Sequence, residues 1–144
     1  SITLETTGLD YQDDLASIYL EAGRLLEAEE ILIQSFAQKE QKFGSESRHL
    51  NQVLILSARL DLLKGEYAEA EQKSRRALSV MTGIFGDESS KTVPAMLALA
   101  EVSESIGDYD KAAYLLQTSI DYQKKRVWSS AYRCWQINLK TSAG

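Results

Sequence analysis

The stretch LLKGEYAEAEQKSRRAL, Leu62 to Leu78, contains a glycine, a tyrosine two positions later and an alanine three positions after that. The same arrangement recurs in AGRLLEAEE around Gly23 and IGDYDKAAY around Gly107, with leucine as the large residue around Gly23. Successive copies of this glycine are 42 residues apart. A fixed period in this range is typical of a chain built from repeated supersecondary units, and it decides the fold class before any other feature.

Small residues recur at fixed distances from each of these glycines. Alanine stands seven residues before the glycine and five residues after it in all three copies. Helices can approach closely only where no bulky side chain separates their axes. The glycine itself is suited to ending a helix in the left-handed conformation. Each copy is therefore predicted to be a helical hairpin with close-approach alanines, which are Ala16, Ala58, Ala100, Ala28, Ala70 and Ala112.

The boundaries between the hairpins carry their own signals. A second glycine, Gly44 and then Gly86, also recurs at 42 residues, and turn and capping residues follow each one. Pro94 lacks an amide hydrogen and is tolerated only in the first turn of a helix. The first helix of the third copy is therefore predicted to begin within about a turn before Pro94, with a hydroxyl residue as its cap. The candidate caps are Ser89, Ser90 and Thr92.

This pattern resembles the tetratricopeptide repeat (TPR), with small residues at two close-approach points and a large residue just after the mid-hairpin glycine. The usual unit has 34 residues; the 42-residue unit here is similar to the longer hairpins of kinesin light chains. The resemblance implies an all-α, right-handed α-solenoid of three TPR hairpins plus a C-terminal helical segment. A single domain over 1–144 is expected, with repeats at about 9–44, 49–86 and 91–127 and a capping or extension helix at about 128–140.

Bulk properties narrow the function classes. The net charge is −5, from 16 basic and 21 acidic side chains, so nucleic acid is not an expected partner. The single cysteine, Cys134, cannot form an intramolecular disulfide, which favours a reducing, intracellular compartment such as the cytoplasm. Membrane insertion is not expected, because no apolar run is long enough to span a bilayer. The chain begins at Ser1, and we interpret it as a piece of a longer protein.

Catalytic chemistry is not expected. His49 is the only histidine, so a multi-histidine metal site is excluded by count. The abundant glutamates recur in register on outward-facing positions of the second helices, which is typical of a solvated face. We therefore expect neither enzyme activity nor a cofactor or metal. The predicted function is protein–protein interaction, as an adaptor or scaffold module.

The resemblance implies that ligand-facing side chains lie on the first helices, which line the concave face of such an array. The predicted groove has an apolar middle, an acidic first wall at Asp13 and Asp14 and a lone arginine, and would suit a segment carrying leucines and a basic residue. Packing of Ile55, Leu56 and Leu97 between neighbouring helices is the alternative. The predicted groove residues are Asp13, Ser17, Leu20, Gln52, Ile55, Arg59, Leu62, Leu97, Glu101 and Glu104.

The residues that bind two known ligand classes in the family are absent from these positions. A clamp for chaperone C-terminal tails would need basic and amide groups at Asp13, Ser17, Leu56, Pro94 and Ala98, and none of these positions carries one. The paired asparagines of kinesin light chains would fall at Ile55–Leu56 and at Leu97–Ala98, where they are also absent. Chaperone tails are therefore not expected as partners, and the kinesin type of cargo peptide is in doubt.

The C-terminal segment carries an aromatic stripe at helical spacing, made of Trp128, Tyr132, Trp135 and Leu139. One interpretation is a cap whose aromatic residues pack on the third hairpin near Leu116 and Ile120, since terminal repeats are usually atypical. The other is an exposed docking face for a second copy or a partner. The second interpretation leads to an alternative function, a structural self-association or bracing domain that forms a homodimer through its aromatic C-terminal helix.

Overall fold

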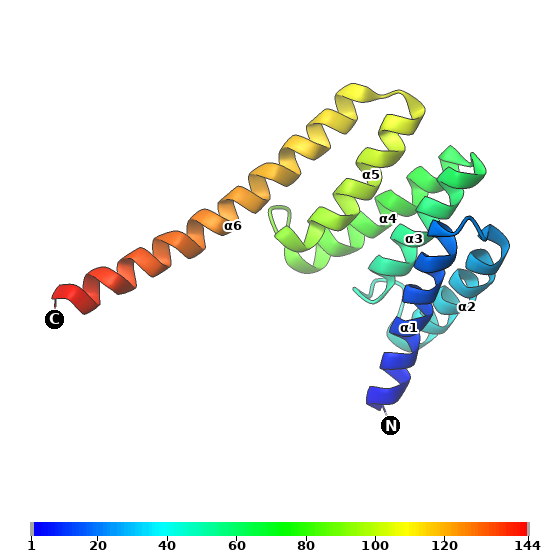
Figure 1. Cartoon of the computed structure of the whole chain (residues 1–144), viewed down its shortest axis with the longest axis horizontal. Coiled ribbons are helices and arrows are strands. Elements are labelled where there is room, and N and C mark those ends of the chain that lie inside the picture. Colours follow the sequence, from blue (N-terminus) through cyan, green and yellow to red (C-terminus); the bar gives the residue numbers. More distant parts are fainter. Residues whose placement is uncertain (1, 144) are drawn as a thin grey trace.

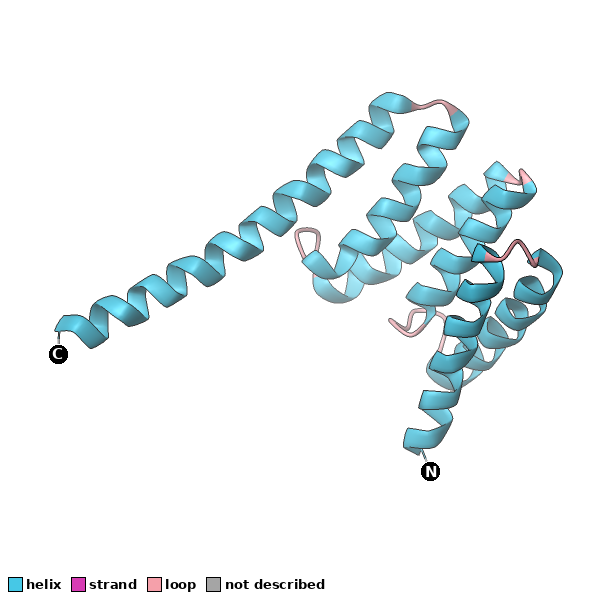
Figure 2. Cartoon of the chain, in the orientation of Figure 1, coloured by secondary structure: helices cyan, strands magenta, loops and turns pink. Residues whose placement is uncertain are grey.

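The computed structural model describes residues 2–143, and the surroundings of the side chains of residues 11–127 and 131–138. The described chain folds into an α-solenoid of six α-helices without a strand (Figures 1 and 2). The first helix begins at Ile2, earlier than the predicted repeat boundary at about residue 9. The helices are α1 (Ile2–Glu21), α2 (Leu25–Phe43), α3 (Leu50–Lys64), α4 (Tyr67–Phe85), α5 (Val93–Ile106) and α6 (Tyr109–Ala143), with a short 3₁₀ helix, η1 (Ser90–Thr92), before α5.

Each mid-hairpin glycine closes a tight turn between two antiparallel helices. Gly65 has φ +80°, the left-handed conformation that side chains with a Cβ rarely adopt. The Glu66 N–H donates to the Asp61 carbonyl oxygen at 2.7 Å, which satisfies one of the carbonyl groups left over at the end of α3. The equivalent bond closes the turns at Gly23 and Gly107. The three hairpins therefore end their first helices by the same local mechanism.

The close-approach alanines are buried in all three hairpins, as the repeat pattern predicts. Their exposed fractions range from 0% to 6%. Since a larger side chain at these points would push the helix axes apart, the alanines set the spacing of the two layers. The six residues are Ala16, Ala58, Ala100, Ala28, Ala70 and Ala112.

The first helices form one layer and the second helices form the other (Figure 1). Along the first layer, α1 contacts α3 and α3 contacts α5. The central helix α3 packs against α1, α2, α4 and α5, which explains why its sequence is apolar on nearly every side. Its residues Leu50 and Val53 are fully buried in the main core, together with Leu32 of α2.

The start of α5 confirms the prediction made from Pro94. The helix begins at Val93, so Pro94 lies in its first turn. The preceding 3₁₀ turn is capped by Ser89, whose Oγ accepts a hydrogen bond from the Lys91 N–H at 3.2 Å. The Thr92 hydroxyl donates to the Ser89 carbonyl oxygen at 2.7 Å. This hydroxyl network fixes where the third hairpin begins.

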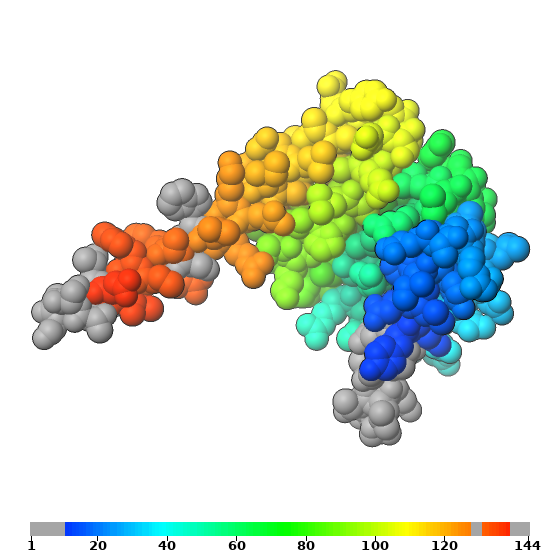
Figure 3. Space-filling model, in the orientation of Figure 1, coloured from blue at the N-terminus to red at the C-terminus, as the bar shows by residue number. Residues whose placement is uncertain are grey.

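The C-terminal segment is not a separate helix. It continues α6, which is a single helix of 35 residues and about 50 Å in length. No glycine stands where Gly44 and Gly86 end the earlier hairpins, so nothing stops the helix near residue 128. A continuous helix cannot fold back on its own Leu116 and Ile120, which are 44% and 45% exposed. The cap predicted for the third hairpin is therefore not formed, and the end of α6 projects beyond the array (Figures 1 and 3).

Candidate binding groove

A concave pocket of about 270 Å³ lies across the three first helices. On α3 and α5 the lining residues repeat at intervals of three or four, so each helix presents one face to the pocket. Residues 42 positions apart in the sequence occupy equivalent places on the two helices. The lining comprises Ser17 of α1, Gln52, Ile55, Leu56 and Arg59 of α3, and Pro94, Leu97, Ala98 and Glu101 of α5.

Six of the ten predicted groove residues meet in this pocket. They are Ser17, Gln52, Ile55, Arg59, Leu97 and Glu101. Leu97 is 43% exposed and Ile55 is half-buried, so the floor is apolar and open to a ligand. Arg59 and Glu101, both exposed, supply opposite charges at the rim. Leu97 is therefore not buried by packing between neighbouring helices, which was the alternative interpretation.

The other predicted groove residues lie elsewhere. Leu20 is only 4% exposed and belongs to the main core with Ala16 and Leu32. Leu62 packs, partly buried, against a smaller cluster that contains Ala70. Both stand three residues before a mid-hairpin glycine, where the last turn of the first helix already faces the second helix. The burial of Leu20 contradicts its placement in the groove, and Leu62 lies outside the pocket lining. Glu104 is exposed on α5 but lies outside the pocket lining.

Asp13 lines the second cavity described below, but it is not the free acidic wall expected from the sequence. Its side chain is 3% exposed, and both carboxylate oxygens are bound inside the first hairpin. Ser35 Oγ donates to Oδ1 at 2.7 Å, and the Lys39 ammonium donates to Oδ2. Lys39 is as deeply buried as Asp13. A buried carboxylate that is paired in this way presents no net charge to a ligand.

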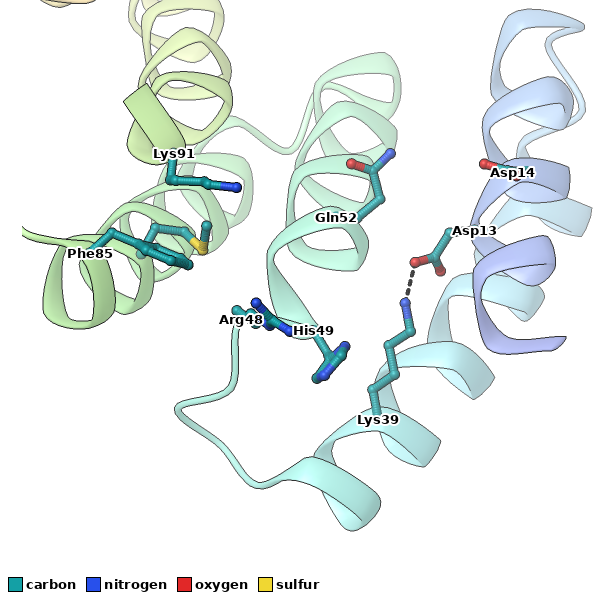
Figure 4. Close-up of a pocket in the computed structure, with 9 residues that line it drawn as sticks. Asp13, Asp14, Lys39, Arg48, His49, Gln52, Phe85 and Lys91 are labelled. Carbon is teal, nitrogen blue, oxygen red and sulfur yellow. Dashed lines mark hydrogen bonds and ion pairs between the residues drawn. The ribbon is translucent and has the colours of Figure 1, made fainter. Parts of the chain in front are cut away.

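A second cavity, of about 430 Å³, extends the concave face toward the loops that precede α3 and α5. Figure 4 shows its lining converging from α1, α2, the α2–α3 loop, α3, α4 and η1. Gln52 lines both cavities, so they adjoin at this side chain, and we call the two together the concave groove. The lining of the second cavity comprises Asp13, Asp14, Lys39, Arg48, His49, Gln52, Met81, Phe85 and Lys91.

Exposed basic side chains dominate this end of the concave groove. Arg48 and Lys91 are exposed, while Asp14 is the exposed acid among the lining residues. The Lys91 ammonium lies 5.8 Å from the centroid of the Phe85 ring, within reach of a cation–π contact. The His49 ring stacks on Phe43 with centroids 3.9 Å apart, which holds the loop against α2. The groove therefore joins an apolar floor to a basic end.

Sequence reasoning missed Arg48 and Lys91. It placed ligand-facing residues only within the first helices, whereas Arg48 precedes α3 and Lys91 lies in η1. The available signal was positional: both residues occupy the short segments after Gly44 and Gly86 that lead into a first helix. Such segments border the same face as the helix that they precede.

A third cavity lies between the second helices and is separate from the concave groove. It encloses about 460 Å³ and is floored by apolar side chains that include Ile33, Phe36 and Leu54. The Arg76 guanidinium covers the Phe36 ring at 5.1 Å and pairs with Glu40 at 3.0 Å. We call this cavity the outer slot.

The predicted C-terminal face is described only in part. Tyr132 and Trp135 are each 57% exposed, with ring centroids 6.0 Å apart. The side chains of Trp128 and Leu139 lie outside the described residues. Across the described part of the chain, no cluster of three or more histidine, cysteine or acidic side chains is arranged to hold a metal ion. Within the same residues, no helix has both the length and the apolar character needed to cross a membrane.

Comparison with known proteins agrees with this architecture. A family model described as tetratricopeptide repeat matches residues 49–125. Among solved structures, the chain is similar to a candidate kinesin light chain from Podosopora anserina with nearly identical TPR-like repeats, at a TM-score of 0.75 and 23% sequence identity. That match covers 84% of this chain and 57% of the other, so this chain spans little more than half the length of that protein. No match was found among the curated proteins.

Proposed function

Because the chain belongs to the tetratricopeptide repeat family, we propose that it is a protein-interaction module whose concave groove holds a segment of another protein. The observation that carries the proposal is the shared pocket of Ser17, Gln52, Ile55, Arg59, Leu97 and Glu101 across three helices. A ligand in this pocket contacts all three hairpins at once, so its affinity depends on the assembled array and not on one helix. The proposed role is that of a non-catalytic adaptor or scaffold.

The polarity of the groove favours a particular kind of segment. An apolar side chain of the ligand would lie over Ile55 and Leu97, where apolar area can be removed from water. An acidic side chain one or two residues away would lie near Arg48 and Lys91 at the basic end. This preference replaces the basic ligand residue expected from the sequence, since the Asp13 carboxylate is already neutralised by Lys39.

The lone cysteine, Cys134, agrees with a reducing environment, and we place the module in the cytoplasm. This placement rests on cysteine usage and not on the groove. Expression of the chain with a fluorescent tag would test it.

Selection of a random peptide library on the immobilised chain tests the groove. Selected peptides should combine a large apolar residue with an acidic residue, and the double variant Arg59→Glu, Leu97→Asp should weaken their binding about tenfold or more. The matched control is Ile33→Asp, Arg75→Glu, which makes the same chemical changes on the second helices. Equal losses in both variants, or peptides that bind the groove variant unchanged, would overturn the proposal.

A further inference from the structure

The last hairpin leaves open a face that the previous hairpin buries. In α4, Ser74 and Met81 are 0% and 6% exposed, and Leu78 packs against the cluster that holds Met96 and Leu99 of α5. The residues 42 positions later are Leu116, Ile120 and Gln123 of α6, and all three are exposed. The third hairpin thus presents the surface on which another helix would pack in a continuing array.

This open face continues along the projecting end of α6. Val127 is 66% exposed, and Ala131 and Cys134 are exposed on the same side of the helix, at intervals of four and three residues. Gln123, Val127, Ala131 and Cys134, together with Arg126, also line a shallow depression of about 580 Å³. We call the row Leu116, Ile120, Gln123, Val127, Ala131 and Cys134 the α6 stripe.

Between Ile120 and Cys134, the spacing of the α6 stripe is the same in both directions from Val127. Going back along the helix, the intervals to Gln123 and Ile120 are four and three; going forward, those to Ala131 and Cys134 are four and three. Intervals of three and four keep a stripe on one side of a helix that packs against another. A two-fold symmetric interface between antiparallel helices must be self-complementary, and a stripe symmetric about one residue meets that condition.

The charges of the chain are distributed unevenly along its length. All 21 acidic side chains lie at or before Asp121, whereas five of the 16 basic ones follow it. Residues 1–121 therefore carry a net charge of −10 and residues 122–144 a net charge of +5. Opposite potentials on the acidic array and on the C-terminal end of α6 favour their association. Lys124, Lys125 and Arg126 lie within three residues of Val127 and would repel their counterparts near the axis of such a pair. Within one chain, Lys125 already pairs with Glu88, an acidic residue of the loop before η1.

We propose that two copies of this chain pair antiparallel through the α6 stripe, with the two-fold axis at Val127. Ile120 of each copy then faces Cys134 of the other, and Gln123 faces Ala131. The projecting, basic end of α6 in one copy covers the open face of the third hairpin in the other, as α5 covers α4 within the chain. This surface is distinct from the concave groove, which stays accessible in both copies.

Molar mass in solution tests the pairing directly. Light scattering on the full chain at micromolar concentration should give twice the mass of one chain. Val127→Glu places two carboxylates together on the axis and should give a folded monomer, while Gln136→Glu, on the opposite side of α6, should leave the dimer intact. A monomeric wild-type chain, or a Val127→Glu variant that stays dimeric with unchanged circular dichroism, would overturn the proposal.

A crosslinking experiment tests the register without disturbing the stripe by charge. In a Cys134→Ser background, Val127→Cys puts a thiol on the axis, where it meets its own copy within disulfide reach. Oxidation with diamide should convert this variant to a covalent dimer at least about tenfold faster than the Gln136→Cys variant in the same background. Equal rates for the two variants would rule out an axis at Val127.

Discussion

At the scale of single residues, the buried pair of Asp13 and Lys39 is the feature that departs most from the repeat. Forty-two residues later, the equivalent positions hold Ile55 and Met81, and Ala77 stands at the position of Ser35. The first hairpin therefore uses a hydrogen-bonded ion pair where the second uses apolar packing. Burying charges costs free energy that can exceed the attraction between them, so a buried pair is by itself weak evidence of stabilisation.

Removing one partner of this pair should be far more harmful than replacing the whole group. We expect Asp13→Ala to lower the free energy of unfolding by about 3–5 kcal/mol, because it leaves the Lys39 ammonium buried without a counter-charge. The triple variant Asp13→Ile, Ser35→Ala, Lys39→Met copies the second hairpin and should lie within about 1.5 kcal/mol of the wild type. Urea denaturation measures both. A triple variant as unstable as Asp13→Ala would contradict this interpretation.

The close-approach alanines support a second prediction at this scale. Ala70 is fully buried, whereas its neighbour Glu69 is exposed. Ala70→Leu should overpack the hairpin and cost about 1–3 kcal/mol, and Glu69→Leu should be nearly neutral. Thermal melts of the two variants make the comparison, and similar losses at the two positions would show that the helix faces are misassigned.

At the scale of elements, Glu71 links two hairpins through charge. Its carboxylate accepts a hydrogen bond from Lys111 of α6 at 3.2 Å and pairs with Arg75 of its own helix at 2.5 Å. The hydrogen bond from Lys111, with a further contribution from Arg75, holds the pKa of Glu71 below its usual value. A lowered folded-state pKa means that the stabilisation is present above the ordinary pKa and is lost as the pH falls through the lowered one.

The lowered pKa of Glu71 makes the effect of the substitution Glu71→Gln on stability depend on pH. At neutral pH the variant should be about 0.5–1 kcal/mol less stable than the wild type, the range typical of partly exposed ion pairs. As the pH falls below about 4, the wild-type carboxylate becomes protonated and the difference should shrink toward zero. Chemical denaturation at several pH values measures the difference. A gap that stays constant or grows in acid would mean that Glu71 does not act through its charge.

Elements differ in how far their sequence determines them. The hairpin boundaries could be predicted because glycine and proline restrict the backbone locally: Gly65 and Pro94 act within one turn of helix. The course of α6 beyond the third hairpin could not be predicted in the same way. The missing glycine at residue 128 signalled a different ending, but whether the helix turned back or continued depends on packing and not on a local rule.

At the scale of the whole molecule, the concave groove depends on the side-by-side packing of three helices, α1, α3 and α5. The fixed period placed Gln52, Ile55, Arg59 and their equivalents on one face, because residues 42 positions apart occupy the same place in successive repeats. The period could not reveal that Asp13 is neutralised by Lys39, a residue 26 positions away on another helix. It also could not reveal the basic end, since Arg48 and Lys91 belong to loops that the helical pattern does not describe.

The central claim, that the concave groove is the binding surface, is tested most directly by mapping a bound peptide on the isotope-labelled chain. A peptide selected on the wild type is titrated while backbone amide chemical shifts are recorded. We predict that the largest shifts occur at Ser17, Gln52, Ile55 and Leu97 and extend toward Arg48, while the outer slot around Ile33 and Phe36 is unchanged. Shifts concentrated at the outer slot, or along the α6 stripe, with the concave groove unperturbed would contradict the claim.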